Sequence, residues 1–78
     1  MVWIRFYGVI RGVVGTRDFK FDFKGSMGEL LETLCELYPM LGDQLGMSVV
    51  LLNNMTYTDE DPVGDEDEII IMPALGGG

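Results

Sequence analysis

The residues best placed to do chemistry lie at the C-terminus, where Pro73, Ala74 and Leu75 are followed by Gly76-Gly77-Gly78. A proline followed closely by three glycines neither continues a strand nor begins a helix, so residues 73–78 are expected to form a flexible tail. Six extended residues reach about 20 Å, and glycines without a Cβ fit a narrow channel in another protein. This pattern indicates that the α-carboxylate of Gly78 is the reactive group. The alternative is an ordinary frayed chain end.

The charge and the rare residues exclude several kinds of site. The chain has 13 acidic and 5 basic residues, a net charge of −8, no histidine and one cysteine. The net charge repels phosphate backbones, so no nucleic-acid partner is expected; it either favours a basic partner or serves solubility. Without histidine, and with a single cysteine, neither a His-dependent catalytic triad nor a cysteine-based metal site can form.

Two remaining features could suggest chemistry. Between residues 58 and 68 lie seven carboxylates: Asp59, Glu60, Asp61, Asp65, Glu66, Asp67 and Glu68. The sequence Pro62-Val63-Gly64 interrupts the alternate ligand positions of a calcium loop, so no metal site is predicted there. Cys35 has no Lys, Arg or His near it in the sequence, so it is interpreted as a small apolar filler at the edge of a helix stripe rather than as a reactive thiol.

The size and hydropathy predict a single globular domain. Seventy-eight residues, 47% of them hydrophobic, are close to the smallest chain that buries a sufficient core. No apolar run approaches the ~18 residues of a transmembrane helix, and the region after Met1 lacks the pattern of a signal peptide. We therefore expect no membrane partner and a cytoplasmic location.

Alternating apolar and polar residues predict two strands near the N-terminus. Over residues 2–7, the expected core face is formed by Val2, Ile4 and Phe6. Trp3 and Tyr7 then lie on the outer face, where they either cap the sheet or form a contact surface. Residues 18–24 alternate in the same way, with three phenylalanines toward the core. The glycine-rich residues 8–16 are expected to be a loop, which makes the two strands an antiparallel hairpin.

The second half of the chain predicts one helix and further strands. A capping-box pattern at Ser26 begins the helix, and Pro39 ends it. One face of this helix is an apolar stripe, formed by Met27, Leu30, Leu31, Leu34 and Tyr38. Residues 40–46 are expected to be a connection. Residues 48–52, apolar on both faces, predict a strand in the middle of the sheet, which an asparagine turn follows.

The last strands complete the predicted fold. Residues 55–57 could form a short edge strand, and the run Ile69-Ile70-Ile71-Met72 predicts the final strand. We therefore expect an α+β domain over residues 1–72: a mixed four- to five-stranded sheet with one helix packed across one face. If the last strand runs parallel to the first, it lies in the middle of the sheet and the tail leaves from a rigid support.

This order of elements, ending in a glycine tail, resembles the ubiquitin-like β-grasp sulfur carriers. Within that superfamily it is similar to the MoaD/ThiS-like proteins, such as the small subunit of molybdopterin synthase, and to archaeal small modifier proteins. The resemblance covers nearly the whole chain, through these stretches: Arg5-Phe6-Tyr7, Ile10-Arg11, Gly15-Thr16-Arg17, residues 29–39, residues 49–54, Gly64-Asp65, Asp67-Glu68-Ile69, and Pro73 with Gly77-Gly78.

The resemblance implies a carrier with no catalytic residues of its own. A ubiquitin-activating-like partner enzyme would adenylate Gly78 with ATP, and a sulfur donor would convert the acyl-adenylate to a thiocarboxylate. By position, Gly76 and Gly77 would line the partner's channel. The adenylating enzyme and the large subunit of molybdopterin synthase would recognise an apolar neck, formed by Met72, Pro73, Ala74 and Leu75. The chain would bind no cofactor itself, because ATP is used by the partner.

Several functions remain open on the sequence. The thiocarboxylate sulfur would go to molybdopterin, which the overall pattern favours, or to thiamine or tRNA. Alternatively, the Gly78 carboxylate would form an isopeptide bond with a lysine of a target protein. A third hypothesis, of another class, is a non-covalent interaction domain that uses the bare sheet face around Trp3 and Tyr7.

Overall fold

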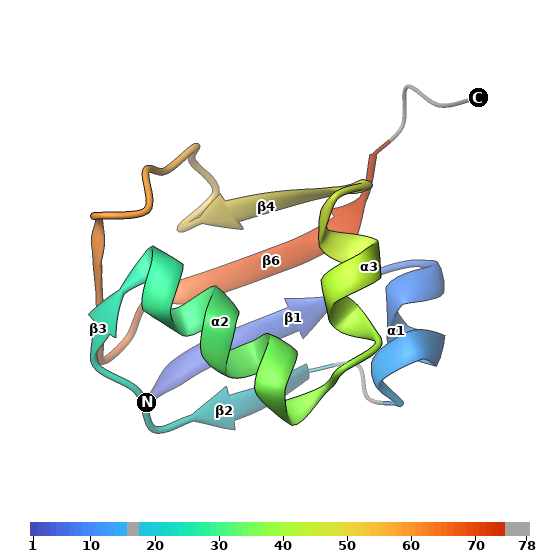
Figure 1. Ribbon diagram of the computed structural model, residues 1–78. Helices are drawn as coiled ribbons and strands as arrows, with labels where there is room; N and C mark the ends of the chain where they lie inside the picture. Colours follow the sequence, from blue (N-terminus) through green and yellow to red (C-terminus); the bar gives the residue numbers. More distant parts are fainter. Residues whose placement is uncertain (16–17, 75–78) are drawn as a thin grey trace.

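The computed structural model describes residues 1–15 and 18–74. Its main sheet has four strands in the order β2-β1-β6-β4 (Figure 1). Their bounds are β1 Val2–Phe6, β2 Asp18–Phe21, β4 Ser48–Leu52 and β6 Glu68–Pro73. β1 pairs antiparallel with β2 and parallel with β6, and β4 pairs antiparallel with β6. This confirms the mixed sheet, and it shows that the last strand runs parallel to the first and lies beside it in the middle of the sheet.

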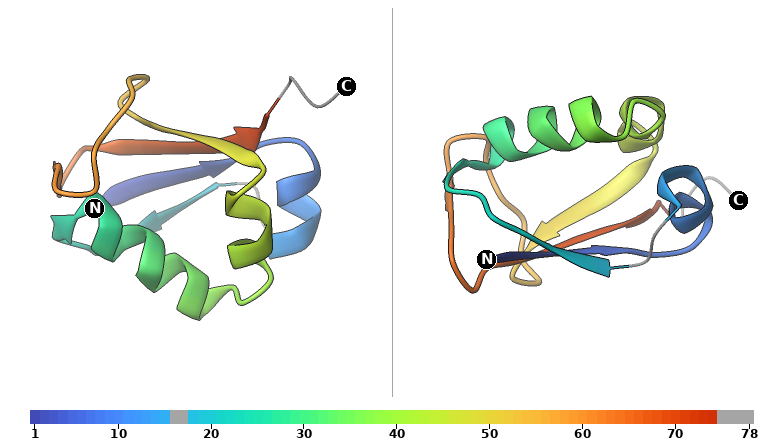
Figure 2. Two further views of the ribbon diagram at one scale, coloured as in Figure 1. Left: turned by 45° about the horizontal axis from the view of Figure 1, so that its top comes forward. Right: turned by 90° about the horizontal axis from the view of Figure 1, so that it is seen from below.

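Three helices and a small second sheet complete the domain. The helices are α1 Val9–Val14, α2 Met27–Leu37 and α3 Leu41–Leu45, and the second sheet pairs β3 Gly25–Ser26 with β5 Pro62–Val63. In Figure 2, α2 extends across one face of the main sheet, and no helix covers the opposite face among the described residues. The α+β β-grasp architecture predicted from the sequence is therefore confirmed.

The core lies between the sheet and α2. The predicted inner face of β1 is fully buried, with Val2, Ile4 and Phe6 each 0% exposed. Beside them in the sheet, β6 contributes Ile69 and Ile71. On the opposite side of the core, α2 contributes Met27, Leu30 and Leu34. The ring of Phe6 lies 5.9 Å from that of Phe19 and 6.2 Å from that of Tyr38, so β1, β2 and the end of α2 share one aromatic cluster. Phe21 and Phe23 are half-buried against the same core.

The N-terminus of α2 has the predicted capping box. The backbone N–H of Glu29 donates to Ser26 Oγ at 3.2 Å, and the backbone N–H of Ser26 donates to Glu29 Oε1 at 3.0 Å. These two bonds satisfy amides that have no partner within the helix.

Replacing Ser26 with Ala is expected to lower the free energy of unfolding by about 1 kcal/mol, because one amide of the first turn loses its acceptor. Urea denaturation followed by circular dichroism measures the change. Thr56→Ala, which removes an exposed hydroxyl outside any helix, is the matched control and should change stability by less than about 0.5 kcal/mol. Equal effects of the two substitutions would show that the cap contributes nothing.

Two predicted connections are wrong, because each contains a helix. Residues 8–16 were expected to be a loop, but residues 9–14 form α1, whose Ile10 is 1% exposed. Residues 40–46 were expected to be a connection, but they contain α3, with Leu41 at 0% exposed. Helices this short have little stability in isolation, so they depend on the side chains that they pack on the core, which include Val14 of α1 and Leu45 of α3 as well.

The predicted position of residues 48–52 is also wrong. They form β4, which lies at the edge of the sheet, whereas β1 and β6 are central. One face of β4 packs on the core through Val50 and Leu52. The other face is also apolar but is not covered by a helix, and Val49 on it is 39% exposed.

Smaller differences concern the ends of strands. β2 ends at Phe21 rather than at residue 24, and the expected short strand at residues 55–57 is only an isolated bridge between Leu52 and Met55. The asparagine turn is confirmed, since Asn53 and Asn54 have φ of 50° and 65°. Within the described residues, no helix has the length and apolar character needed to cross a membrane.

Candidate functional site

The end of β6 is held on both sides by neighbouring strands. The backbone N–H of Tyr7 donates to the carbonyl of Ile71 at 3.0 Å, and the N–H of Ala74 donates to the carbonyl of Met47 at 3.1 Å. Because β1 and β6 are parallel, the end of β1 lies beside the end of β6, and Figure 1 shows both strands ending at the same end of the sheet. The chain is therefore fixed up to Ala74.

An apolar groove lies beside this exit. It has a volume of about 500 Å³ and is lined by Tyr7, Gly8, Ile70, Met72 and Pro73. Alternate residues of β6 face opposite ways, and since Ile69 and Ile71 are in the core, Ile70 and Met72 lie on the bare face of the sheet. The groove thus opens on the face that α2 does not cover. It is a surface on which an apolar side chain of a partner fits, next to the start of the tail.

The predicted neck residues divide into two groups. Met72 and Pro73 are half-buried and line the groove, and Ala74 follows them as an exposed residue. Leu75, Gly76, Gly77 and Gly78 lie outside the described residues. Three groove residues were not among the predicted partner-binding residues: Tyr7, Gly8 and Ile70. Of these, only Tyr7 carried a signal, because the alternation of residues 2–7 places it on the outer face.

A cationic and aromatic cluster occupies the bare face further along β1. Lys20 Nζ lies 4.8 Å from the centre of the Trp3 ring, and Arg5 Cζ lies 5.9 Å from it. Arg5 Nε also lies 3.0 Å from Glu68 Oε2. A side-chain hydrogen bond with Tyr7 and the charge of Glu68 raise the pKa of Arg5, so its guanidinium remains charged. Trp3 is 37% exposed, so this cluster caps the sheet and also leaves an aromatic surface open.

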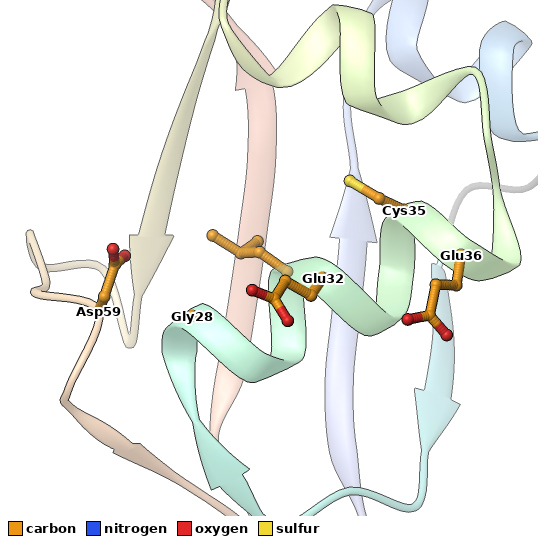
Figure 3. Close-up of a pocket in the computed structure, with 6 residues that line it drawn as sticks. Gly28, Glu32, Cys35, Glu36 and Asp59 are labelled. Carbon is orange, nitrogen blue, oxygen red and sulfur yellow. The ribbon is translucent and has the colours of Figure 1, made fainter.

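A second hollow, on the side of α2, has a different character (Figure 3). It has a volume of about 520 Å³ and is lined by Gly28, Leu31, Glu32, Cys35, Glu36 and Asp59. In Figure 3 the Cys35 sulfur points toward α3 and away from the carboxylates, and Cys35 is half-buried in the lining of this hollow. The lining includes three carboxylates and no Lys or Arg, so the hollow is acidic. Across the described ranges, no group of three or more Asp, Glu, Cys or His side chains could hold a metal ion.

The four-stranded sheet crossed by one long helix, with a C-terminal segment leaving from the central strand, defines a ubiquitin-like β-grasp protein. The chain belongs to the ThiS family, whose model matches residues 4–78. No curated protein sequence matches the chain.

Solved structures of low sequence identity share this fold. The chain is similar to the small archaeal modifier protein 1 of Methanosarcina acetivorans, with a TM-score of 0.84 and 22% identity over 99% of this chain and 95% of that one. It is similar to a putative molybdopterin converting factor subunit 1 from Pyrococcus furiosus, with a TM-score of 0.81 and 11% identity over 95% and 97% of the two chains. A complex of subunits 1 and 2 of the molybdopterin-converting factor from Helicobacter pylori contains a chain with a TM-score of 0.71 and 23% identity, over 99% and 97%.

Family membership narrows the class of function. A member of the ThiS family with this fold is a sulfur carrier or a ubiquitin-like modifier, and small carriers of this kind are generally non-catalytic subunits. The family does not determine which pathway receives the sulfur.

Proposed function

We propose that the protein is a sulfur carrier for molybdopterin biosynthesis and that its Gly78 carboxyl group becomes a thiocarboxylate. The observation that carries the proposal is the end of β6, a central strand held by β1 and β4, which directs the chain out beside an apolar groove. Such an arrangement would provide a rigid mount for a reactive group further along the chain, together with a surface for the enzyme that acts on it. The thiocarboxylate itself is supported by membership of the ThiS family.

The first step would activate the carboxylate. An oxygen of the Gly78 carboxylate attacks the α-phosphorus of ATP in the partner's active site; a bond forms between that oxygen and phosphorus, and pyrophosphate leaves. The resulting acyl-adenylate has AMP as a good leaving group, whereas a free carboxylate is a poor electrophile. In the second step hydrosulfide attacks the carbonyl carbon, the C–S bond forms, and AMP leaves. No electrons are exchanged with an oxidant or reductant.

The described residues would contribute binding rather than catalysis. The groove is apolar, and the residues that line it include neither an acid nor a basic side chain, so the proton transfers and phosphate contacts of adenylation fall to the partner. The adenylating enzyme and the large subunit of molybdopterin synthase would both need access to the same neck, and would therefore bind in turn.

Met72→Asp is expected to weaken docking to the adenylating enzyme. Burying a methionine side chain contributes about 1.5–3 kcal/mol, so a carboxylate in its place should raise the KM for the carrier roughly ten- to hundredfold. ATP–pyrophosphate exchange at varied carrier concentration measures this KM. Met55→Asp, at a methionine that is 69% exposed beyond the opposite end of β4, is the matched control and should leave KM unchanged. Equal KM values for the two variants would place the docking surface elsewhere.

A genetic experiment tests the pathway. Deleting the gene should abolish the activity of molybdenum- or tungsten-dependent enzymes in the source organism, and the full chain should restore it. A chain that lacks Gly77 and Gly78 should not. Normal activity of these enzymes in the deletion strain, together with loss of thiamine synthesis or of tRNA thiolation, would instead assign the carrier to one of those pathways.

The second candidate function is covalent modification of lysines. It is favoured by the likeness to small archaeal modifier proteins, and it needs the same activated Gly78. In cells, an epitope-tagged chain would then form conjugates of higher mass that disappear when Gly77 and Gly78 are deleted. If no such conjugates form under any growth condition, this candidate is excluded and the sulfur carrier stands alone.

A further inference from the structure

The junction between β1 and α1 contains a position, residue 8, at which only glycine fits. Gly8 has φ 63° and ψ −142°, a backbone conformation that residues with a Cβ rarely adopt. A Cβ built on Gly8 would lie 2.8 Å from Cγ of Pro73 and 3.1 Å from its Cδ. The proline ring therefore packs directly on the backbone of Gly8, at a distance that leaves no room for a side chain.

This contact is placed where the chain leaves the sheet. Two residues before Pro73, the carbonyl of Ile71 accepts a hydrogen bond from the N–H of Tyr7, and immediately after Pro73 the N–H of Ala74 donates to the carbonyl of Met47. The two hydrogen bonds fix the backbone on either side, and the contact with Gly8 fixes the ring between them. Pro73 is thus held between Tyr7 and Gly8, which follow β1, and Met47, which precedes β4.

We propose that Gly8 is a positioning residue for the tail: by having no side chain it seats the Pro73 ring, and the seated ring sets the direction in which the chain continues from Ala74. This inference rests on the proposed function, because direction matters only if Gly78 must reach a reacting atom. The four residues after Ala74 reach at most about 13 Å, so the point and direction at which the chain leaves Pro73 limit where the Gly78 carboxylate can be presented to a reacting atom.

Three variants separate positioning from backbone strain. Gly8→Ala introduces both strain and the contact with Pro73. Gly15→Ala, at the other end of α1, introduces strain alone, since Gly15 has φ 79° and nothing lies within 4 Å of a Cβ there. Pro73→Ala removes the ring, and the double variant Gly8→Ala/Pro73→Ala tests whether the added methyl group acts through it.

The first measurement is the kinetics of adenylation by the cognate enzyme, at a temperature where each variant is folded. Gly8→Ala should lower kcat roughly 10²-fold with KM within about twofold, and Gly15→Ala should leave both unchanged. Pro73→Ala should lower kcat about tenfold, and the double variant should match it. The proposal is overturned if Gly8→Ala raises KM and leaves kcat unchanged, because that would be an effect on docking. It is also overturned if the effects of Gly8→Ala and Pro73→Ala on kcat add up in the double variant. Should Gly8→Ala not fold, an unchanged kcat in Pro73→Ala alone overturns it.

The second measurement needs no enzyme. Amide hydrogen exchange of Ala74 reports the bond to Met47, and it should be at least about tenfold faster in Gly8→Ala than in the wild type or in Gly15→Ala. Equal exchange rates in all three overturn the proposal. If the wild type is never adenylated, the sulfur-carrier proposal fails, and this exchange rate still decides whether Gly8 seats Pro73.

Discussion

Adding one alanine after Gly78 is expected to abolish adenylation of the protein. The reactive group in this account is the α-carboxylate of Gly78, and an extra residue moves the terminal carboxylate by ~3.5 Å, beyond the near-attack geometry of the reaction with ATP. The added Cβ would also have to enter the narrow channel that we propose for the partner enzyme. We expect kcat/KM for ATP–pyrophosphate exchange to fall by about 10³-fold or more.

Gly78→Ala is the graded control for this experiment. It retains the position of the carboxylate and adds only the Cβ, so its activity should lie between those of the wild type and of the extended chain. The buried core residues lie between Val2 and Ile71, so both variants should unfold at the wild-type temperature. An extended chain that is adenylated as well as the wild type would contradict the account and would favour non-covalent binding through the sheet face around Trp3 and Tyr7.

Phe6→Ala is expected to have the largest effect on stability. Phe6 is 0% exposed on a central strand and joins Phe19 and Tyr38 in the aromatic cluster. Removing a buried phenylalanine side chain costs about 3–5 kcal/mol, while a domain of this size has about 4–12 kcal/mol of stability in total. The variant should therefore lose at least about a quarter of the free energy of unfolding, and its denaturation midpoint should fall in proportion.

Chemical denaturation followed by far-UV circular dichroism measures this effect. Val9→Ala is the control, because Val9 is 69% exposed and the substitution should change the free energy of unfolding by no more than about 0.5 kcal/mol. A cost below about 1 kcal/mol for Phe6→Ala would mean that the aromatic cluster does not hold β1 against α2.

The sequence was most informative where one face of an element is buried. The alternation of Val2, Ile4 and Phe6 and the capping box at Ser26 identified β1 and α2 correctly, because both signals arise from local geometry. Helix α1 was missed because Gly12 and several β-branched residues give it a low helix propensity, and the burial of Ile10 depends on the rest of the core. The central place assigned to residues 48–52 was wrong because an apolar bare face and a covered face give the same pattern.

Of the residues that line the groove, the sequence predicted those with a local signal and missed those without one. Met72 and Pro73 follow directly from the apolar run and the proline that precede the tail. Ile70 was hidden in that run, since a sequence apolar at every position does not indicate which residues face outward. The contact of Gly8 with Pro73 joins residues 65 positions apart, brought together by the parallel pairing of β1 and β6, and no local pattern reports such a contact.

The most direct test of the account is the intact mass of the purified protein after incubation with its cognate adenylating enzyme, ATP and hydrosulfide. The account predicts a gain equal to the replacement of one oxygen atom by one sulfur atom, located by fragmentation at Gly78 and absent when ATP is omitted. An unchanged mass with an enzyme that binds the protein and hydrolyses ATP would contradict it, and so would a sulfur atom found at Cys35 instead of Gly78.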